Sequence, residues 1–258
     1  MRADCHVHLD KIGGPHKTVP PSVEMFTAYA QRESISLFFV IYEKDGTLAR
    51  FQATGYNLVP IYWERTPLAP NIPTVTQGIK LHPYIERYQL TRGNVEPVLE
   101  EARARNLFIF IHTEDREPEL SRGRLVADLA AAYPSLIFVM AHSGSYAPPQ
   151  VNDPSSIFIA ETRVRELVSE AVDVARRFDN IYLETSILAS DAKAEILAGA
   201  PLSKLLIGSD FPIMENEQWS SLRFQEEQLL RFGLSERDIE RVHQNAIELA
   251  RATGIRQG

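Results

Sequence analysis

Residues 107–142 read LFIFIHTEDREPELSRGRLVADLAAAYPSLIFVMAH and contain one complete strand–helix–strand unit. Two short apolar runs, LFIFIH at 107–112 and LIFVMAH at 136–142, have the length and the aromatic and β-branched content of buried strands. Between them, RGRLVADLAAAY at 122–133 has the spacing of apolar residues that is typical of a helix. This order of elements predicts two parallel strands joined by a helix.

The same alternation extends along the whole chain of 258 residues. Six further strand-like runs are ADCHVH (3–8), ISLFFVIY (35–42), LVPIYW (58–63), GIKLH (78–82), NIYLETS (180–186) and KLLIGSD (204–210). Further helices are predicted at 94–105, 161–178, 220–232 and 235–253, whereas 43–57 shows only a short helical pattern at TLARF. Eight strands without a glycine-rich dinucleotide fingerprint favour an α/β (β/α)8 TIM barrel over an open sheet, as one domain spanning 1–258.

The composition narrows the class of partner. Hydrophobic residues at 44% and charged residues at 24% are typical of a globular protein. A net charge of −7 without a dense Lys/Arg cluster excludes a dedicated nucleic-acid binder and favours a small-molecule partner. Cys5 is the only cysteine, and there is neither a signal segment nor an apolar run of membrane-spanning length, so we expect a cytoplasmic protein that does not bind membranes. The oligomeric state has no signature in the sequence.

The first strand carries two histidines separated by one valine. Because residues two apart on a strand point to the same side, we expect Asp4, His6 and His8 to share the inner face of the barrel, with Cys5 and Val7 on the other face. Burying polar side chains inside the barrel costs free energy unless they have hydrogen-bond partners or bind an ion. A divalent metal ion is such a partner.

Other strands also end on potential ligands, namely His112, His142 and Asp210. The carboxyl ends of barrel strands meet at one mouth, where the active sites of such barrels lie, so these side chains are expected to converge with those of the first strand. Imidazoles and a carboxylate suit Zn²⁺, while Mn²⁺, Fe²⁺ and Ni²⁺ stay open. The pattern therefore predicts a metal site formed by strands one, five, six and eight.

These motifs resemble the amidohydrolase superfamily, specifically its amidohydrolase-related (amidohydrolase 2) branch. The similarity rests, in order, on HVH, GIKLHP, FIHTE, MAHSG, IGSDFP and QNAIELA, and spans the chain. It implies that His6, His8, His112 and Asp210 bind the metal, and that His142 either bonds the bound water or substrate or ligates a second ion. It also implies that Asp210 is the general base that takes a proton from the metal-activated water.

The resemblance implies a metal-dependent hydrolase that cleaves a small, carboxylated amide, lactone or ester. Two alternatives stay open: a metal-dependent, non-oxidative decarboxylase of a small unsaturated or aromatic acid, and a non-catalytic barrel scaffold. The expected cofactor is one Zn²⁺ ion, with a second ion if Lys80 is carbamylated; a free cationic Lys80 facing a substrate carboxylate is preferred.

Several residues beside the expected mouth have a substrate-binding or a structural interpretation. Lys80, Tyr84 and Arg116 follow strand ends and favour an anionic substrate. His82 is expected to be substrate-adjacent or structural, and Glu184 either orients a metal ligand or forms a structural ion pair. We expect His243, on the last helix, to be solvated.

Overall fold

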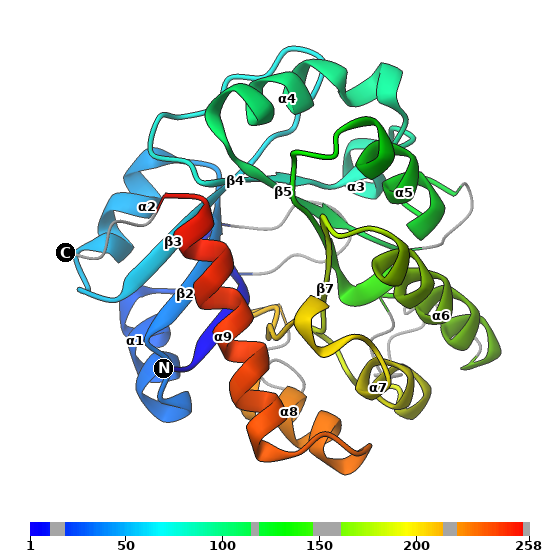
Figure 1. Ribbon diagram of the computed structural model, residues 1–258. Coiled ribbons are helices and arrows are strands. Elements are labelled where there is room, and N and C mark those ends of the chain that lie inside the picture. The colour runs from blue at the N-terminus through cyan, green and yellow to red at the C-terminus, as the bar shows by residue number, and fades with distance from the viewer. Residues whose placement is uncertain (11–18, 115–118, 147–160, 214–220, 255–258) are drawn as a thin grey trace.

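The computed structural model describes residues 1–10, 19–114, 119–146, 161–213 and 221–254, and it confirms the predicted barrel (Figure 1). Eight parallel strands follow one another around a single sheet in sequence order. They are β1 (Ala3–His8), β2 (Leu37–Tyr42), β3 (Asn57–Trp63), β4 (Gly78–Leu81), β5 (Phe108–His112), β6 (Phe138–Ala141), β7 (Ile181–Glu184) and β8 (Leu205–Leu206). Each lies within one of the eight predicted runs or one residue beyond it.

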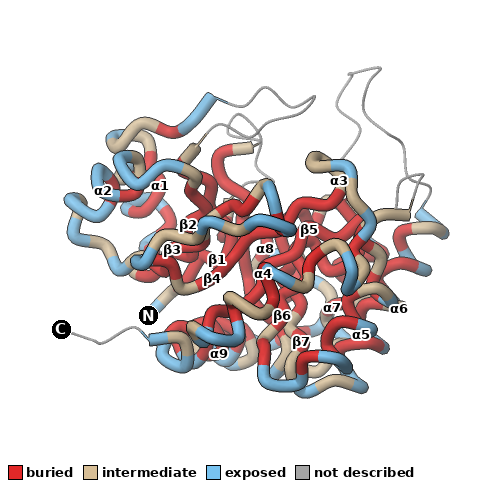
Figure 2. The backbone as a smooth tube through the Cα atoms, turned by 90° about the horizontal axis from the view of Figure 1, so that it is seen from above, coloured by how far each residue is buried: buried red, intermediate tan, exposed pale blue. Residues whose placement is uncertain are grey.

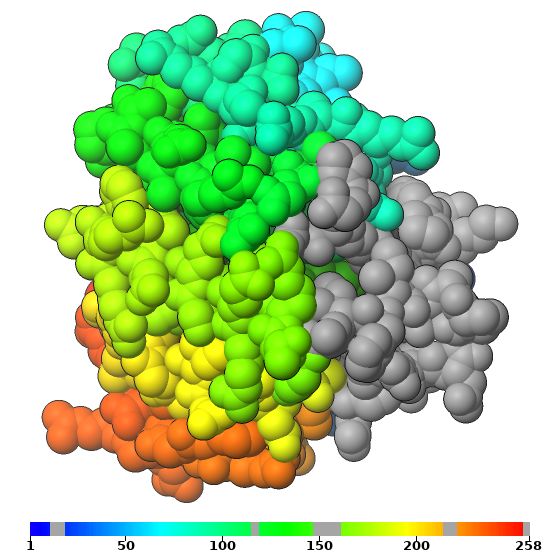
Figure 3. Space-filling view, turned by 90° about the vertical axis from the view of Figure 1, so that its right-hand side faces the viewer, coloured from blue at the N-terminus to red at the C-terminus, as the bar shows by residue number. Residues whose placement is uncertain are grey.

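Helices cover the outside of the sheet. They are α1 (Val23–Glu33), α2 (Asp45–Gln52), α3 (Pro83–Glu86), α4 (Arg92–Arg105), α5 (Gly123–Ala132), α6 (Glu161–Arg177), α7 (Asp191–Ala198), α8 (Leu222–Arg231) and α9 (Glu236–Ala252), with short 3₁₀ turns at His142–Gly144 and Leu202–Lys204. Figure 3 shows one side of this layer as successive bands, from α5 (green) through α6 and α7 to α8 (orange). The predicted helices are confirmed, and α2 occupies the segment with the unclear pattern.

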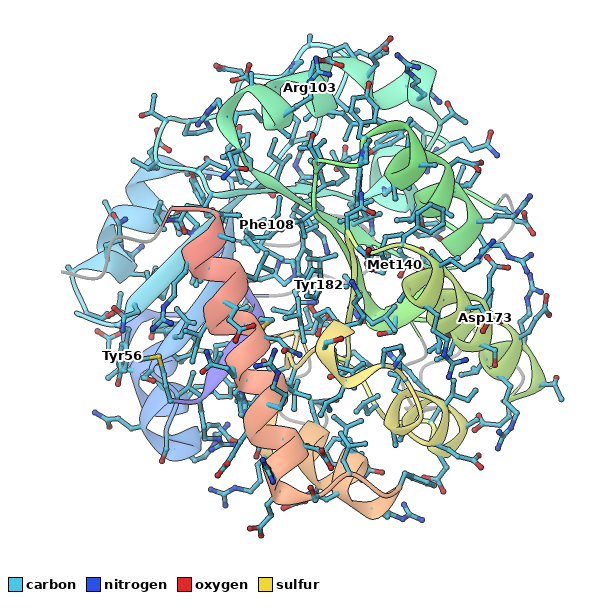
Figure 4. The ribbon with its side chains drawn as sticks, in the orientation of Figure 1. Tyr56, Arg103, Phe108, Met140, Asp173 and Tyr182 are labelled. Carbon is cyan, nitrogen blue, oxygen red and sulfur yellow. The ribbon has the colours of Figure 1, made fainter. Side chains whose placement is uncertain are left out.

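The barrel interior is packed with large apolar side chains. Phe39, Ile61, Phe108 and Phe110 form one buried cluster inside the ring, while the alternate residues of the same strands pack against the outer helices. Figure 2 shows this buried centre surrounded by exposed helix faces, and Phe108 is labelled near the middle of the ring in Figure 4. A Cβ on Gly78 would lie 2.4 Å from the Phe108 ring, so only glycine allows that ring to fill the core.

A β-bulge in β1 corrects one expectation about the histidine strand. Asp4 pairs with Phe38 and Val7 pairs with Val40, so Cys5 and His6 together stand opposite Phe39. The extra residue breaks the alternation of side chains. Asp4 therefore does not share a face with His6 and His8 but lies on the side of α1, where it accepts hydrogen bonds from Tyr29 Oη (2.7 Å) and Ser209 Oγ (2.6 Å).

Hydrogen bonds between β1 and the segment after β8 close the barrel. The Cys5 amide donates to Ile207 O (2.9 Å), the Asp210 amide to His6 O (2.9 Å), and the His8 amide to Phe211 O (2.8 Å). Because these bonds fix the segment that follows β8 against β1, the aspartate and the histidine pair are held side by side although they lie at opposite ends of the sequence.

Helix α9 lies on the side of the barrel opposite to α3 (Figure 2), and it corrects the expectation for His243. His243 is only 4% exposed; its Nδ1 accepts a hydrogen bond from the Ala3 amide (3.2 Å) and its Nε2 lies 2.8 Å from Glu226 Oε1. Glu226 also pairs with Arg2 (2.6 Å). His243 is thus a structural residue that joins α9 to β1 and α8.

No helix within the described ranges is long and apolar enough to cross a membrane.

Candidate metal centre

Three side chains at the carboxyl ends of β1 and β8 bring their ligating atoms together. His6 Nε2 lies 3.2 Å from His8 Nε2 and 3.2 Å from Asp210 Oδ1, and His8 Nε2 lies 3.3 Å from the same oxygen. Four ligands arranged as a tetrahedron at about 2.0–2.1 Å from a zinc ion are separated by about 3.3–3.4 Å. The triangle therefore has the dimensions of three corners of a tetrahedral metal site.

Asp210 has the properties expected of a carboxylate that binds a cation. Its side chain is buried, and neither carboxylate oxygen has a hydrogen-bond partner among the described residues. Burial raises the pKa of Asp210 well above its ordinary value, which the nearby charge of Lys80 only partly offsets. A buried carboxylate without a hydrogen bond is expensive, and a divalent ion would satisfy it. The residues present fit a metal.

Glu184 at the end of β7 orients His6. Its Oε2 lies 3.0 Å from His6 Nδ1, and burial lowers the pKa of His6 well below its ordinary value, so the ring is neutral. Glu184 also accepts hydrogen bonds from the Ser186 amide (2.6 Å), Ser186 Oγ (2.8 Å) and the His142 amide (3.2 Å). A carboxylate beside Nδ1 places the ring proton there, which leaves the Nε2 lone pair directed at the triangle.

The same carboxylate determines the protonation of His142 through Ser186. Ser186 Oγ donates to Glu184 and lies 2.9 Å from His142 Nδ1, so it must accept the proton of that nitrogen. The Nε2 atom of His142 is then unprotonated, as in His6. Burial lowers the pKa of His142, which keeps its ring neutral. The rings of His6 and His142 lie 5.1 Å apart, and both are oriented by Glu184.

Two of these site residues have a left-handed backbone. The φ angles are +61° at His142 and +62° at Asp210, in a region that residues other than glycine seldom occupy. Such conformations cost about 1–3 kcal/mol each and persist where the surrounding structure enforces them, typically at functional sites. At both positions an unfavourable backbone conformation is retained, as expected where it directs a side chain into a functional site.

His112 lies at the same mouth but outside the triangle. Its ring centroid is 4.7 Å from that of His142 and 3.8 Å from that of His82, on which it stacks, and its Nε2 is 3.4 Å from Glu114 Oε2. Within the described ranges, the groups of ligating atoms close enough to share an ion are His6, His8 and Asp210, and His6, His142 and Glu184. The structure thus brings together three of the five expected ligands, with His142 beside them and His112 beside His142.

Lys80 enters the mouth from β4 as a buried cation. It is 1% exposed, its Nζ has no hydrogen-bond partner in the described part of the chain, and it lies 4.7 Å from the centroid of the Phe110 ring. Burial lowers its pKa to about 8 against the opposing effect of Asp210 and Glu184. Tyr84 follows in α3 and is half-buried, whereas Arg116 lies outside the described residues.

Lys193 is a buried group at the site that the sequence did not indicate. Its Nζ donates to Ser145 O (3.1 Å), Ser186 O (2.7 Å) and Ile187 O (3.2 Å). It therefore ties together the segments that follow β6 and β7, including the serine that contacts His142. In the sequence, Lys193 has no local pattern that distinguishes it from a lysine on the exposed face of a helix.

Comparisons with known proteins give matches in sequence and in fold. A family model described as Amidohydrolase matches residues 76–251. A zinc-bound amidohydrolase from Burkholderia multivorans has 13% identity and a TM-score of 0.66, covering 97% of this chain and 99% of its own. A probable 2-pyrone-4,6-dicarboxylic acid hydrolase from Acinetobacter baumannii with bound citric acid has 13% identity and a TM-score of 0.65, with coverage of 96% and 98%.

A third solved structure, IDCase from Metarhizium anisopliae, has 15% identity and a TM-score of 0.59, covering 98% of this chain and 97% of its own. At these identities the solved structures establish the fold alone. A search of curated protein sequences gave no match.

Proposed function

The chain belongs to the amidohydrolase family, a family of metal-dependent hydrolases, and on this premise we propose that it cleaves a small carboxylated amide, lactone or ester at one divalent ion. The observation that carries the proposal is the buried triangle of His6 Nε2, His8 Nε2 and Asp210 Oδ1, with separations of 3.2–3.3 Å. His112 is the proposed further ligand at the same mouth.

A bound ion at this site would polarise the carbonyl group of the substrate and make a water molecule more acidic. Asp210 is the proposed general base, because its second oxygen has no other partner among the described residues and can accept a proton. His142 presents an unprotonated Nε2 and is proposed to bond the attacking water or the substrate. Glu184 keeps both imidazoles in the required tautomer.

Zinc is the proposed metal, because two neutral imidazoles and a carboxylate are a ligand set that it favours. The zinc in the Burkholderia multivorans structure supports this choice. A second ion would require a carbamylated Lys80. We favour a single ion and a free Lys80, since a buried ammonium group without a hydrogen-bond partner among the described residues is suited to bind a substrate carboxylate.

The proposal of an anionic substrate rests on that lysine. Tyr84 and Arg116 are proposed to assist it, and the citric acid and the dicarboxylic acid named for the Acinetobacter baumannii protein agree with a carboxylated ligand. We use glutarate as a probe of this property, because it offers two carboxylates and binds metal ions weakly. Lys80→Met is expected to weaken glutarate binding about tenfold or more, whereas Lys44→Met, at an exposed position, should leave it unchanged.

Decarboxylation is the second candidate. The likeness in fold to IDCase, a decarboxylase, supports it, and Lys80 could hold a carboxylate or supply a proton in either reaction. Release of CO₂ from small unsaturated or aromatic acids without lactone or amide cleavage would favour this alternative. A non-catalytic scaffold is set aside, since the family consists of enzymes.

Removal of the paired histidines tests the proposal. The double variant His6→Ala, His8→Ala should lose both bound metal, measured by elemental analysis, and hydrolysis of a panel of carboxylated lactones, amides and esters. His243→Gln is the control. It removes an imidazole that contacts the Ala3 amide and Glu226 and none of the proposed metal ligands, so this variant should retain the metal. Full metal content in the double variant would refute the assignment of the ligands.

A further inference from the structure

His82 has a fixed orientation beside the metal centre. It directly follows β4 and caps α3, where its Nδ1 accepts a hydrogen bond from the Ile85 amide at 3.3 Å. The ring lies between two others: the Trp63 ring at 5.3 Å and 11°, and the His112 ring at 3.8 Å and 14°. Only 7% of the residue is exposed. Two stacked rings and one hydrogen bond thus fix both the plane and the rotation of this imidazole.

The hydrogen bond from Ile85 determines where the proton of His82 lies. A ring nitrogen that accepts an N–H must carry a lone pair, so the proton is on Nε2. Neighbouring rings cover both faces of the imidazole, and the Nδ1 side is occupied by the bond to the helix. Within the described part of the chain, no hydrogen bond to His82 Nε2 is found. The remaining edge therefore offers one N–H donor at the carboxyl end of the barrel.

We propose that His82 is a substrate-contacting residue whose Nε2–H donates a hydrogen bond to a carbonyl or carboxylate oxygen of the substrate. This inference rests on the proposed function, which it extends from the metal and Lys80 to a second recognition group. Lys80 and His82 are two residues apart at the end of β4, so one strand supplies a cationic donor and an uncharged donor to the same mouth.

An uncharged donor has a specific advantage here. A second cation beside a divalent ion would weaken the binding of that ion, whereas a neutral imidazole polarises an oxygen without this repulsion. Its orientation is set before substrate arrives, so little reorganisation accompanies binding. A ligand without a matching oxygen would leave this donor unpaired and is therefore disfavoured. His82 is thereby expected to select substrates that carry an acceptor at this position.

The competing explanation is that His82 only caps α3 and packs against its neighbours. Two substitutions separate these roles. Both His82→Asn and His82→Gln remove the ring and its stacking. Asparagine is a good helix cap whose oxygen can still accept from the Ile85 amide, but it has no donor at the Nε2 position. The glutamine amide reaches that position and keeps the donor.

The test measures the affinity of the zinc-loaded protein for glutarate by calorimetry, together with zinc content. We expect His82→Asn to weaken glutarate binding about tenfold and His82→Gln to stay within about threefold of the wild type, with equal zinc in all three proteins. Wild-type affinity in His82→Asn, or equal losses in both variants, would overturn the inference.

A second measurement is independent of the metal. Nitrogen NMR of the metal-free protein should show the His82 proton on Nε2, and a proton on Nδ1 would overturn the inference. Failure of the wild type to bind zinc would instead contradict the proposed function, and the NMR result would still decide the state of His82.

Discussion

Replacing Glu184 by glutamine should weaken metal binding without removing any ligand. The carboxylate accepts four hydrogen bonds, three of them at Oε2, from His6, the His142 amide and Ser186 Oγ. Glutamine can keep its oxygen at that position, but its NH₂ group must then face the Ser186 amide, which donates to Oε1 at 2.6 Å. In the opposite orientation the NH₂ group faces the N–H donors of His6 and of the His142 amide, and both bonds are lost. Either way a donor faces a donor, and His6 loses its charged partner.

The magnitude follows from the role of such partners. Loss of a carboxylate that orients a metal-bound histidine costs about 10–100-fold in metal affinity. This corresponds to about 1.4–2.8 kcal/mol of binding free energy. The assay is competition for Zn²⁺ with a chromophoric chelator at pH 7, together with thermal unfolding of the metal-free proteins to measure the change in fold stability separately.

Glu195→Gln provides the matched control, because it makes the same chemical change on α7 at an exposed ion pair with Arg165. Its zinc affinity should equal that of the wild type. If Glu184→Gln also binds zinc within twofold of the wild type, Glu184 does not orient His6 for a metal, and the tautomer argument for both histidines fails.

Two further predictions concern packing and pH. Gly208→Ala places a Cβ 2.4 Å from Glu184 Oε1. The resulting overpacking should cost about 1–3 kcal/mol, lower Tm by about 2–10 °C and reduce the zinc content. Gly46→Ala, at a position with open space around it, should change neither Tm nor zinc content. Burial favours a higher pKa for Glu226, but hydrogen bonds from His243 and Arg2 outweigh it and lower that pKa below its ordinary value of 4.5. Its stabilising effect is therefore present above pH 4.5 and disappears as the pH falls through the lowered pKa. Glu226→Gln should lower Tm by about 2–4 °C at pH 7 and by less at pH 3. The control Glu227→Gln, at an exposed position, should have the wild-type Tm at both pH values. An equal loss of Tm at both pH values in Glu226→Gln would contradict this prediction.

The barrel could be predicted from the sequence because its signal is repeated. Each strand is a short apolar run, and the runs that end on His112 and His142 indicate at once a buried strand and a polar mouth. One weak pattern such as 43–57 leaves the fold unaffected, since seven other units specify the same architecture.

The bulge in β1 could not be predicted, because it depends on the pairing with β2. The sequence alternates perfectly through Asp4, His6 and His8, and only the register with Phe38 and Val40 shows that Asp4 turns outward. The partners of Asp4 arrive from distant positions in the chain, Tyr29 on α1 and Ser209 after β8, so no local window contains them.

The same reason explains why the supporting groups of the site were missed or left open. Glu184 had two interpretations until its contact with His6 was known, and Lys193 had none until its three carbonyl partners were known. For His243, a polar residue on an amphipathic helix favours solvent, but the approach of β1 buries it. These contacts arise from the closed fold and carry no spacing signature.

Anomalous diffraction at the zinc edge, from crystals of the zinc-loaded protein, tests the central claim most directly. A single strong peak in contact with His6 Nε2, His8 Nε2 and Asp210 is the predicted result. A map without a peak at these three atoms would contradict the claim, whether the zinc binds elsewhere in the protein or does not bind.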